Sequence, residues 1–163
     1  MCTRLLARCG QGEQGAWTNT AVWAACLAPG AEEVRDSCVR LAEKMVAAAP
    51  RSHSHVNTLG AALYRAGRHA AAAARLEEAV YLHGREGTGW DWYFLAMTYQ
   101  RLGRGAEARQ ALEKARTWAE HAVQGTLDDP LTPLPLSWSQ RLELQRLRRE
   151  AEAVLGSVVV PVW

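Results

Sequence analysis

The chain has 163 residues, of which 48% are hydrophobic and 22% charged, and its formal net charge is +2. This profile is typical of one globular domain with a sizeable core, and such a small charge argues against a nucleic-acid partner. No stretch is long and apolar enough to span a membrane, so we expect a cytoplasmic protein without a membrane partner.

The first residues, 1–16, lack the apolar core of a signal peptide, and we interpret them as a lead-in segment. Whether this lead-in is ordered stays open, and the folded domain is expected at 17–155. The cysteines form no Cys-x-x-Cys pair and have no histidine at zinc-ligand spacing behind them: Cys2, Cys9, Cys26 and Cys38. We therefore expect reduced cysteines that fill apolar space, with neither a metal nor a cofactor.

Helix-forming residues dominate the chain. Ala, Leu, Arg and Glu are frequent, and runs of β-branched residues are nearly absent before the last positions, so the sequence predicts an all-α fold. Helix-breaking prolines and glycines divide it into short helices at Pro29–Gly30, Pro50, Gly67, 84–89, Gly103 and the proline-rich stretch 128–136.

The first predicted pair of helices spans about 18–52. Its first helix, roughly 18–27, has only a loose apolar pattern. The segment "LAEKMVAAAP", which closes at Pro50, is a clearer helix in which Ala42 and Met45 share one face with Cys38.

Two later segments align without a gap: "VNTLGAALYRAGRHAAAAARLEEAV" from Val56 and "WYFLAMTYQRLGRGAEARQALEKAR" from Trp92. Their offset is 36 residues, and apolar or small residues recur at equivalent places in both. The shared pattern comprises Leu59, Gly60, Leu63, Ala72, Leu76 and Ala79 in the first copy, and Trp92, Leu95, Ala96, Tyr99, Ala108, Leu112 and Ala115 in the second. We expect these residues to form the core between paired helices, with Gly60 allowing a close approach.

The repeated pattern resembles the tetratricopeptide repeat family. The second copy fits the signature closely, whereas Val56 and Leu63 replace the usual tryptophan and tyrosine in the first, and both lack the closing proline. The resemblance implies a right-handed solenoid of helical hairpins with about three repeats, at 18–52, 53–88 and 89–122. It also implies a concave groove, lined by the first helix of each repeat, that binds a peptide or protein segment.

A linker at 123–136 and a capping helix at 137–155 are predicted after the repeats, followed by a tail at 156–163. Ser137 suits the N-cap position of this helix. Its apolar side is expected to comprise Trp138, Leu142, Leu144, Leu147, Ala151 and Val154.

The aromatic stretch "WDWYFLAMTYQRLGR" presents two faces at about 100° per residue. The repeat's own core accounts for one face, and the other carries Trp90, Phe94, Met97 and Arg101. Exposed apolar faces often mark binding sites. Together with the matching positions of the preceding repeat, the candidate groove residues are Trp90, Tyr93, Phe94, Met97, Arg101, Asn57, Ala61, Tyr64 and Arg65. The family's clamp for a peptide carboxylate is not expected, because Tyr93 and Met97 occupy its places.

The sequence leaves three possible occupants for the face that carries Trp90, Phe94, Met97 and Arg101. They are the chain's own 136–155 helix or tail, a partner peptide, and a homodimer contact.

The sequence contains no recognisable catalytic constellation. His53 and His55 suit a solvated turn better than a metal site, and Asp128 and Asp129 lie in a proline-rich turn. The sequence therefore predicts a non-catalytic protein-interaction module. The family resemblance further implies a setting in large bacterial signalling proteins, in which similar repeat segments are often found. The alternative is a structural or self-associating adaptor whose groove is covered.

Overall fold

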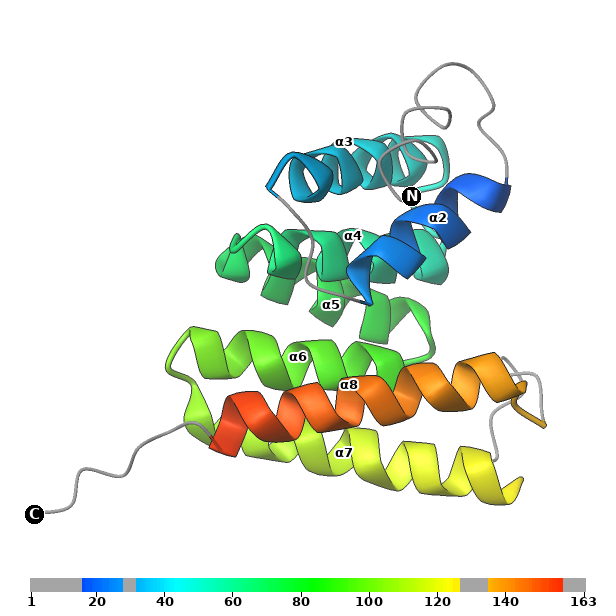
Figure 1. Cartoon of the computed structure of the whole chain (residues 1–163), viewed down its shortest axis with the longest axis vertical. Coiled ribbons are helices and arrows are strands. Elements are labelled where there is room, and N and C mark those ends of the chain that lie inside the picture. Colours follow the sequence, from blue (N-terminus) through cyan, green and yellow to red (C-terminus); the bar gives the residue numbers. More distant parts are fainter. Residues whose placement is uncertain (1–15, 28–31, 127–134, 157–163) are drawn as a thin grey trace, which may run out of the picture. The chain divides into compact units, whose positions relative to one another are not determined.

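The computed structural model describes residues 16–27, 32–126 and 135–156, and within these ranges it consists of seven helices and no strands (Figure 1). The all-α prediction is therefore confirmed. Residues 1–15 of the lead-in, the acidic pair Asp128 and Asp129, and residues 157–163 of the tail lie outside the described residues, whereas Ala16 and Gly156 are helical. The helices divide between two compact units, Met1–Arg85 and Glu86–Trp163, which are treated separately below. None of these helices is long and apolar enough to cross a membrane.

Unit 1 is built around one central helix. Helix α4 (His53–Arg65) packs against α5 (His69–Leu82) and also contacts α2 (Ala16–Cys26) and α3 (Glu32–Ala48). The six core residues predicted from the first repeat copy are all buried between α4 and α5. The hairpin turns at Gly67, whose φ of 74° lies in the left-handed region that glycine adopts without steric cost.

Gly60 sets how closely α4 and α5 approach. A Cβ atom at this position would lie 2.6 Å from Cγ and 2.7 Å from Cδ2 of Leu76, which is itself fully buried. Any larger residue here would force the Leu76 side chain or the helices to shift. The predicted close approach at Gly60 therefore has a specific partner, Leu76.

The cysteines of unit 1 join α2 to α3. Cys26 and Cys38 are free thiols in the core, as the sequence predicts, whereas Cys2 and Cys9 lie outside the described residues. A hydrogen bond with Cys38, together with burial, raises the pKa of Cys26. The same hydrogen bond lowers the pKa of Cys38. Both thiols act as packing groups between the two helices.

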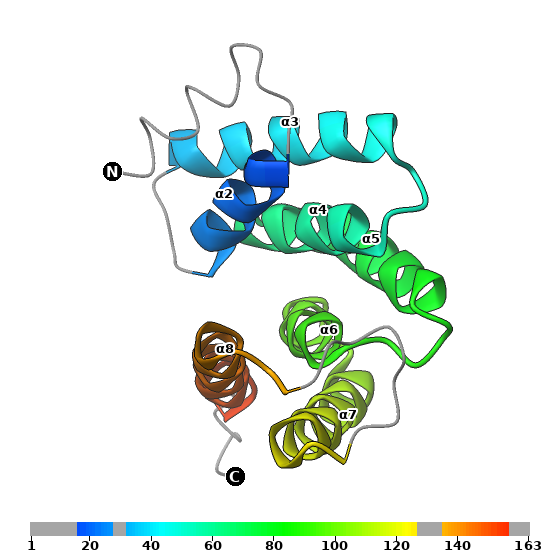
Figure 2. The same cartoon turned by 90° about the vertical axis from the view of Figure 1, so that its right-hand side faces the viewer.

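Unit 2 is a bundle of three helices, seen nearly end-on in Figure 2. Helix α6 (Gly89–Arg101) pairs with α7 (Gly105–Gln124), and α8 (Trp138–Gly156) packs against both. Helix α8 runs in the same direction as α6 (Figure 1). The hairpin core consists of Leu95, Ala96, Tyr99, Ala108, Leu112 and Ala115, all buried. Trp92, predicted as part of this core, is only half-buried, and its Nε1 donates to the Glu86 carbonyl oxygen over 2.8 Å.

The two hairpins share their turn geometry. Gly103 has a φ of 75°, nearly the same as Gly67, and the following residue in each hairpin, Arg68 or Arg104, has a ψ of 60°. In each turn the amide of that arginine donates to a carbonyl five residues earlier, at 2.9 Å in the first hairpin and 2.8 Å in the second. The sequence repeat therefore corresponds to a repeat of local structure.

Side-chain caps fix where α6 and α8 begin. At α6, the Thr88 amide donates to Asp91 Oδ2 over 2.7 Å, and the Asp91 amide donates to Thr88 Oγ1 over 3.4 Å, which forms a capping box. At α8, the Ser137 amide donates to Gln140 Oε1 over 2.9 Å, and the Gln140 amide donates to Ser137 Oγ over 3.3 Å. The predicted capping role of Ser137 is thus present in the structure.

Candidate functional site

The candidate groove residues of α6 are mostly inside the protein. Tyr93, Phe94 and Met97 are fully buried, Trp90 is half-buried, and Arg101 alone is exposed. Trp90 makes an edge contact with Trp118 of α7, with ring centroids 5.2 Å apart. We name these five residues of α6 the α6 cluster. Its central members are packed against protein, not open to solvent.

Helix α8 accounts for part of this burial. A Cβ atom on Gly89 would lie 2.7 Å from Cε3 of Trp118 and 3.2 Å from Cδ2 of Leu144, so the start of α6 fits closely between α7 and α8. One turn further along α6, Tyr93 lies near the charged groups of Arg148 and Glu152 on α8. The side of α6 that bears Gly89 and Tyr93 is therefore occupied by α8.

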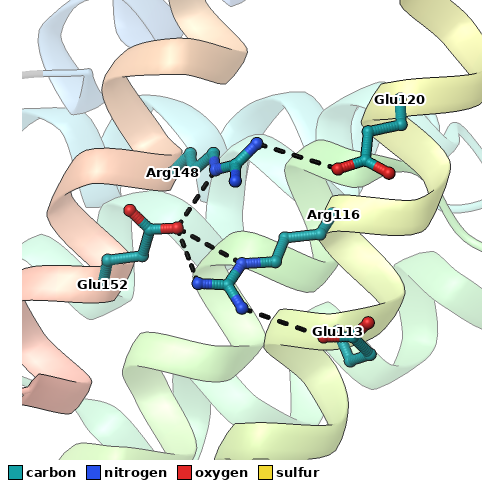
Figure 3. Close-up of polar contacts among 5 residues, drawn as sticks. All are labelled: Glu113, Arg116, Glu120, Arg148 and Glu152. Atoms are coloured by element: carbon teal, nitrogen blue, oxygen red, sulfur yellow. Dashed lines mark hydrogen bonds and ion pairs between the residues drawn. The ribbon is translucent and has the colours of Figure 1, made fainter.

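A network of ion pairs holds α8 to α7 (Figure 3). Glu152 Oε1 accepts from Arg116 Nη2 over 2.7 Å and from Arg148 Nε over 3.0 Å. Two longer contacts extend it, from Arg116 to Glu113 at 3.8 Å and from Arg148 to Glu120 at 4.0 Å. We call these five residues the Glu152 network. Hydrogen bonds from Arg116 and then Arg148 lower the pKa of Glu152, so its carboxylate is held in the charged form.

Tyr93 is the buried polar group beside this network. Its hydroxyl is inside the protein and has no hydrogen-bond partner among the described residues. Burial raises the pKa of Tyr93 to about 12, because the phenolate would lose its hydration there. The side chain therefore acts as a neutral, mainly apolar packing group.

The candidate groove residues of α4 also serve the core. Asn57, Ala61 and Tyr64 are buried, and Arg65 is half-buried. The Arg65 Nε donates to the carbonyl oxygen of Cys26 over 2.6 Å, at the last residue of α2. A cation at a helix C-terminus satisfies an unpaired carbonyl and complements the helix dipole. Arg65 thus caps the C-terminus of α2, whereas Arg101, its counterpart in the next repeat, is exposed.

His53 and His55, which the sequence assigns to a solvated turn, lie instead half-buried in the first turn of α4. His53 packs against His83, with ring centroids 4.7 Å apart. Within the described part of the chain, no three residues of the metal-binding types His, Cys, Asp and Glu come together. The histidine pair therefore reads as packing at the end of the α4–α5 hairpin.

The predicted apolar side of the last helix is partly wrong. Leu144, Leu147 and Ala151 are buried as expected, but Trp138 and Leu142 are 74% and 49% exposed. At about 100° per residue, Trp138 and Leu142 lie on the side of the helix opposite Leu147. The helical phase of α8 already separates these two groups of apolar residues. The prediction that joins both groups into one apolar side is therefore wrong, and Trp138 and Leu142 form an exposed apolar surface.

A scan against protein-family models and a search of curated proteins found no match to this chain.

Proposed function

We propose that this chain is a non-catalytic protein-interaction module built from about three tetratricopeptide-like hairpins, in which α8 occupies the α6 side of the predicted groove. The observation that carries this proposal is the full burial of Tyr93 beside Arg148 and Glu152 of α8. A side chain in that position serves packing, so partners are bound by other surfaces of the module.

The repeat interpretation is supported by the two hairpins α4–α5 and α6–α7. They carry the same residue types at the same places 36 residues apart, and their turns at Gly67 and Gly103 have nearly equal φ angles. Hairpins of this kind leave apolar sides that neighbouring elements cover, which is the physical basis of a repeat array.

The closed arrangement is supported by the Glu152 network. Arg116 and Arg148 come from different helices, and both donate to the same carboxylate oxygen. An open groove along α6 would require α8 to leave, which breaks these bonds and exposes Leu144 and Leu147 to water. These contacts support the covered-groove alternative over a peptide held against Tyr93.

The experiment uses the full chain as immobilised bait in quantitative pull-downs. Saturable capture by the wild type and loss of capture by Leu76→Asp, which places a charge in the core of unit 1, are expected for a folded interaction module. Equal capture by both baits, or no specific capture by the wild type, contradicts the proposal.

A second variant distinguishes a groove that α8 covers from a groove that is open to a partner. Arg101 is the exposed member of the α6 cluster, so Arg101→Glu should leave capture unchanged if the groove is closed. Loss of capture by this variant, with unchanged helicity, would favour an open groove. Light scattering of the wild type tests self-association directly.

A further inference from the structure

The largest exposed apolar side chains of unit 2 lie on α8. Trp138 is 74% exposed and Leu142 49% exposed, and they are one helical turn apart on the same side. The opposite side of α8, with Leu144, Leu147 and Ala151, is buried. Helix α8 therefore has a second apolar surface in addition to the one that packs against α6 and α7.

The backbone that carries the exposed tryptophan is fixed by local contacts. Trp138 directly follows the Ser137 cap, and the preceding Leu136 is buried. Arg141 Nε donates to the Leu136 carbonyl oxygen over 3.2 Å, which ties the first turn of α8 to the segment before it. Because these contacts fix the backbone that carries Trp138, binding of a partner requires no ordering of this turn.

The same side of α8 continues as a basic surface. Gln145, Arg146 and Arg149 follow Leu142 and are exposed. Within the described residues, neither Arg146 nor Arg149 makes an ion pair, in contrast to Arg148 in the Glu152 network. We call this surface the α8 outer face and define it by Trp138, Leu142, Gln145, Arg146 and Arg149.

The geometry points to an acidic peptide segment with an apolar anchor as the ligand of the α8 outer face. This inference rests on the proposed function and names its surface and its class of partner. Carboxylates of the ligand pair with Arg146 and Arg149, and its apolar side chains pack on Trp138 and Leu142. The face itself holds no carboxylate, so the α8 outer faces of two copies cannot pair with each other through complementary charges.

The spacing along α8 specifies the ligand further. Trp138 and Leu142 are one turn apart, and Arg149 lies about 10 Å beyond Leu142 along the helix axis. A helical ligand that matches this face carries two apolar side chains one turn apart and carboxylates about two turns further along. These requirements define a synthetic probe.

The test measures binding of a fluorescent synthetic helix with two leucines one turn apart and two glutamates two turns further along, in an alanine background. Anisotropy titration with the full chain should show saturable binding. Trp138→Ala and the double variant Arg146→Glu/Arg149→Glu should each weaken it by about tenfold or more. The charge-reversed variant should instead bind a probe in which lysines replace the glutamates.

Matched controls lie elsewhere on the protein. Tyr81→Ala removes an exposed aromatic side chain of α5, and Arg109→Glu reverses an exposed charge of α7, so both should bind the acidic probe like the wild type. All the substituted side chains are exposed, so circular dichroism and melting should stay unchanged.

Several outcomes would overturn the inference. Two of them concern the acidic probe: no binding at all, or equal binding by the wild type and the charge-reversed variant. A dimer that Trp138→Ala dissociates would identify a second copy of the chain as the ligand, and binding to phosphatidylserine vesicles without binding to the probe would identify a lipid surface. Equal capture of cellular partners by the wild type and the charge-reversed variant would also contradict binding at the α8 outer face, while the proposed function would stand. Absence of any specific capture by the wild type would overturn the function itself.

Discussion

Gly60 is the residue at which the packing of unit 1 is tightest. Replacing it with alanine would place Cβ 2.6 Å from Leu76 Cγ, so the fully buried leucine or the helices would have to shift. We expect Gly60→Ala to lower the free energy of unfolding by about 1–3 kcal/mol, although alanine is the better helix former. Urea denaturation measures this change.

Gly105 provides the matched control for that substitution. A Cβ atom there would meet its nearest neighbour at an ordinary 3.7 Å, so Gly105→Ala should be neutral or slightly stabilising. If Gly60→Ala is as stable as Gly105→Ala, the close approach of α4 to α5 is wrong.

Tyr93 gives a second prediction at the scale of one residue. Because its hydroxyl has no hydrogen-bond partner among the described residues, Tyr93→Phe should be as stable as the wild type at neutral pH, or more stable by up to about 1 kcal/mol. The measurement is urea denaturation of both proteins at the same pH. A loss of several kcal/mol would show that the hydroxyl has a partner.

The pH dependence of that comparison follows from the raised pKa. The folded state keeps Tyr93 protonated up to a pKa of about 12, whereas the unfolded chain releases the proton near 10. The wild type should therefore lose roughly 2 kcal/mol relative to Tyr93→Phe as the pH rises from about 10 to 12. Parallel stability curves for the two proteins would contradict the burial of this side chain.

At the scale of elements, the Glu152 network decides how firmly α8 is held. The side chains of Glu152 and Arg116 are 36% and 35% exposed, so solvent screens their attraction. We expect Glu152→Gln to lower the free energy of unfolding by only about 0.5–1 kcal/mol, and less at high salt. Glu113→Gln is the control, because that carboxylate is 73% exposed and 3.8 Å from Arg116.

The sign of the pH effect at Glu152 is opposite to that at Tyr93. Its folded-state pKa is lowered by hydrogen bonds from Arg116 and Arg148, so its contribution is present above the unfolded pKa. As the pH falls through the folded pKa, the contribution is lost, and wild type and Glu152→Gln should become equally stable. A difference that persists in acid would mean that the substitution acts through packing.

The boundaries of the helices could be predicted from local sequence, because their determinants are local. Gly67 and Gly103 adopt left-handed turns, and Ser137 caps α8, as their residue types indicate. The burial of Tyr93 could not be predicted in this way. It depends on Arg148 and Glu152, which lie far along the chain, so the helical phase of α6 alone could not distinguish a groove from a packed interface.

At the scale of the whole molecule, aromatic residues that suit a binding surface are divided between the core and the exterior. The α6 cluster contributes the aromatic residues Tyr93 and Phe94 to the core, together with Met97, while Trp138 is exposed on α8. Composition alone does not separate these roles, because the same residue types dominate cores and interfaces. The burial of each side chain distinguishes core residues from candidate binding residues, and it makes α8, not α6, the candidate binding surface.

This division makes a prediction about the α6 cluster. Met97→Ala should cost about 2–5 kcal/mol and Phe94→Ala about 3–5 kcal/mol of unfolding free energy, because each leaves a cavity in a fully buried site. Arg101→Ala, on the same helix but exposed, should change stability by less than about 0.5 kcal/mol. Chemical denaturation followed by circular dichroism compares the three variants under one set of conditions. If Met97→Ala and Phe94→Ala melt like the wild type but lose partner capture, these side chains face a partner. The covered groove would then have to be abandoned.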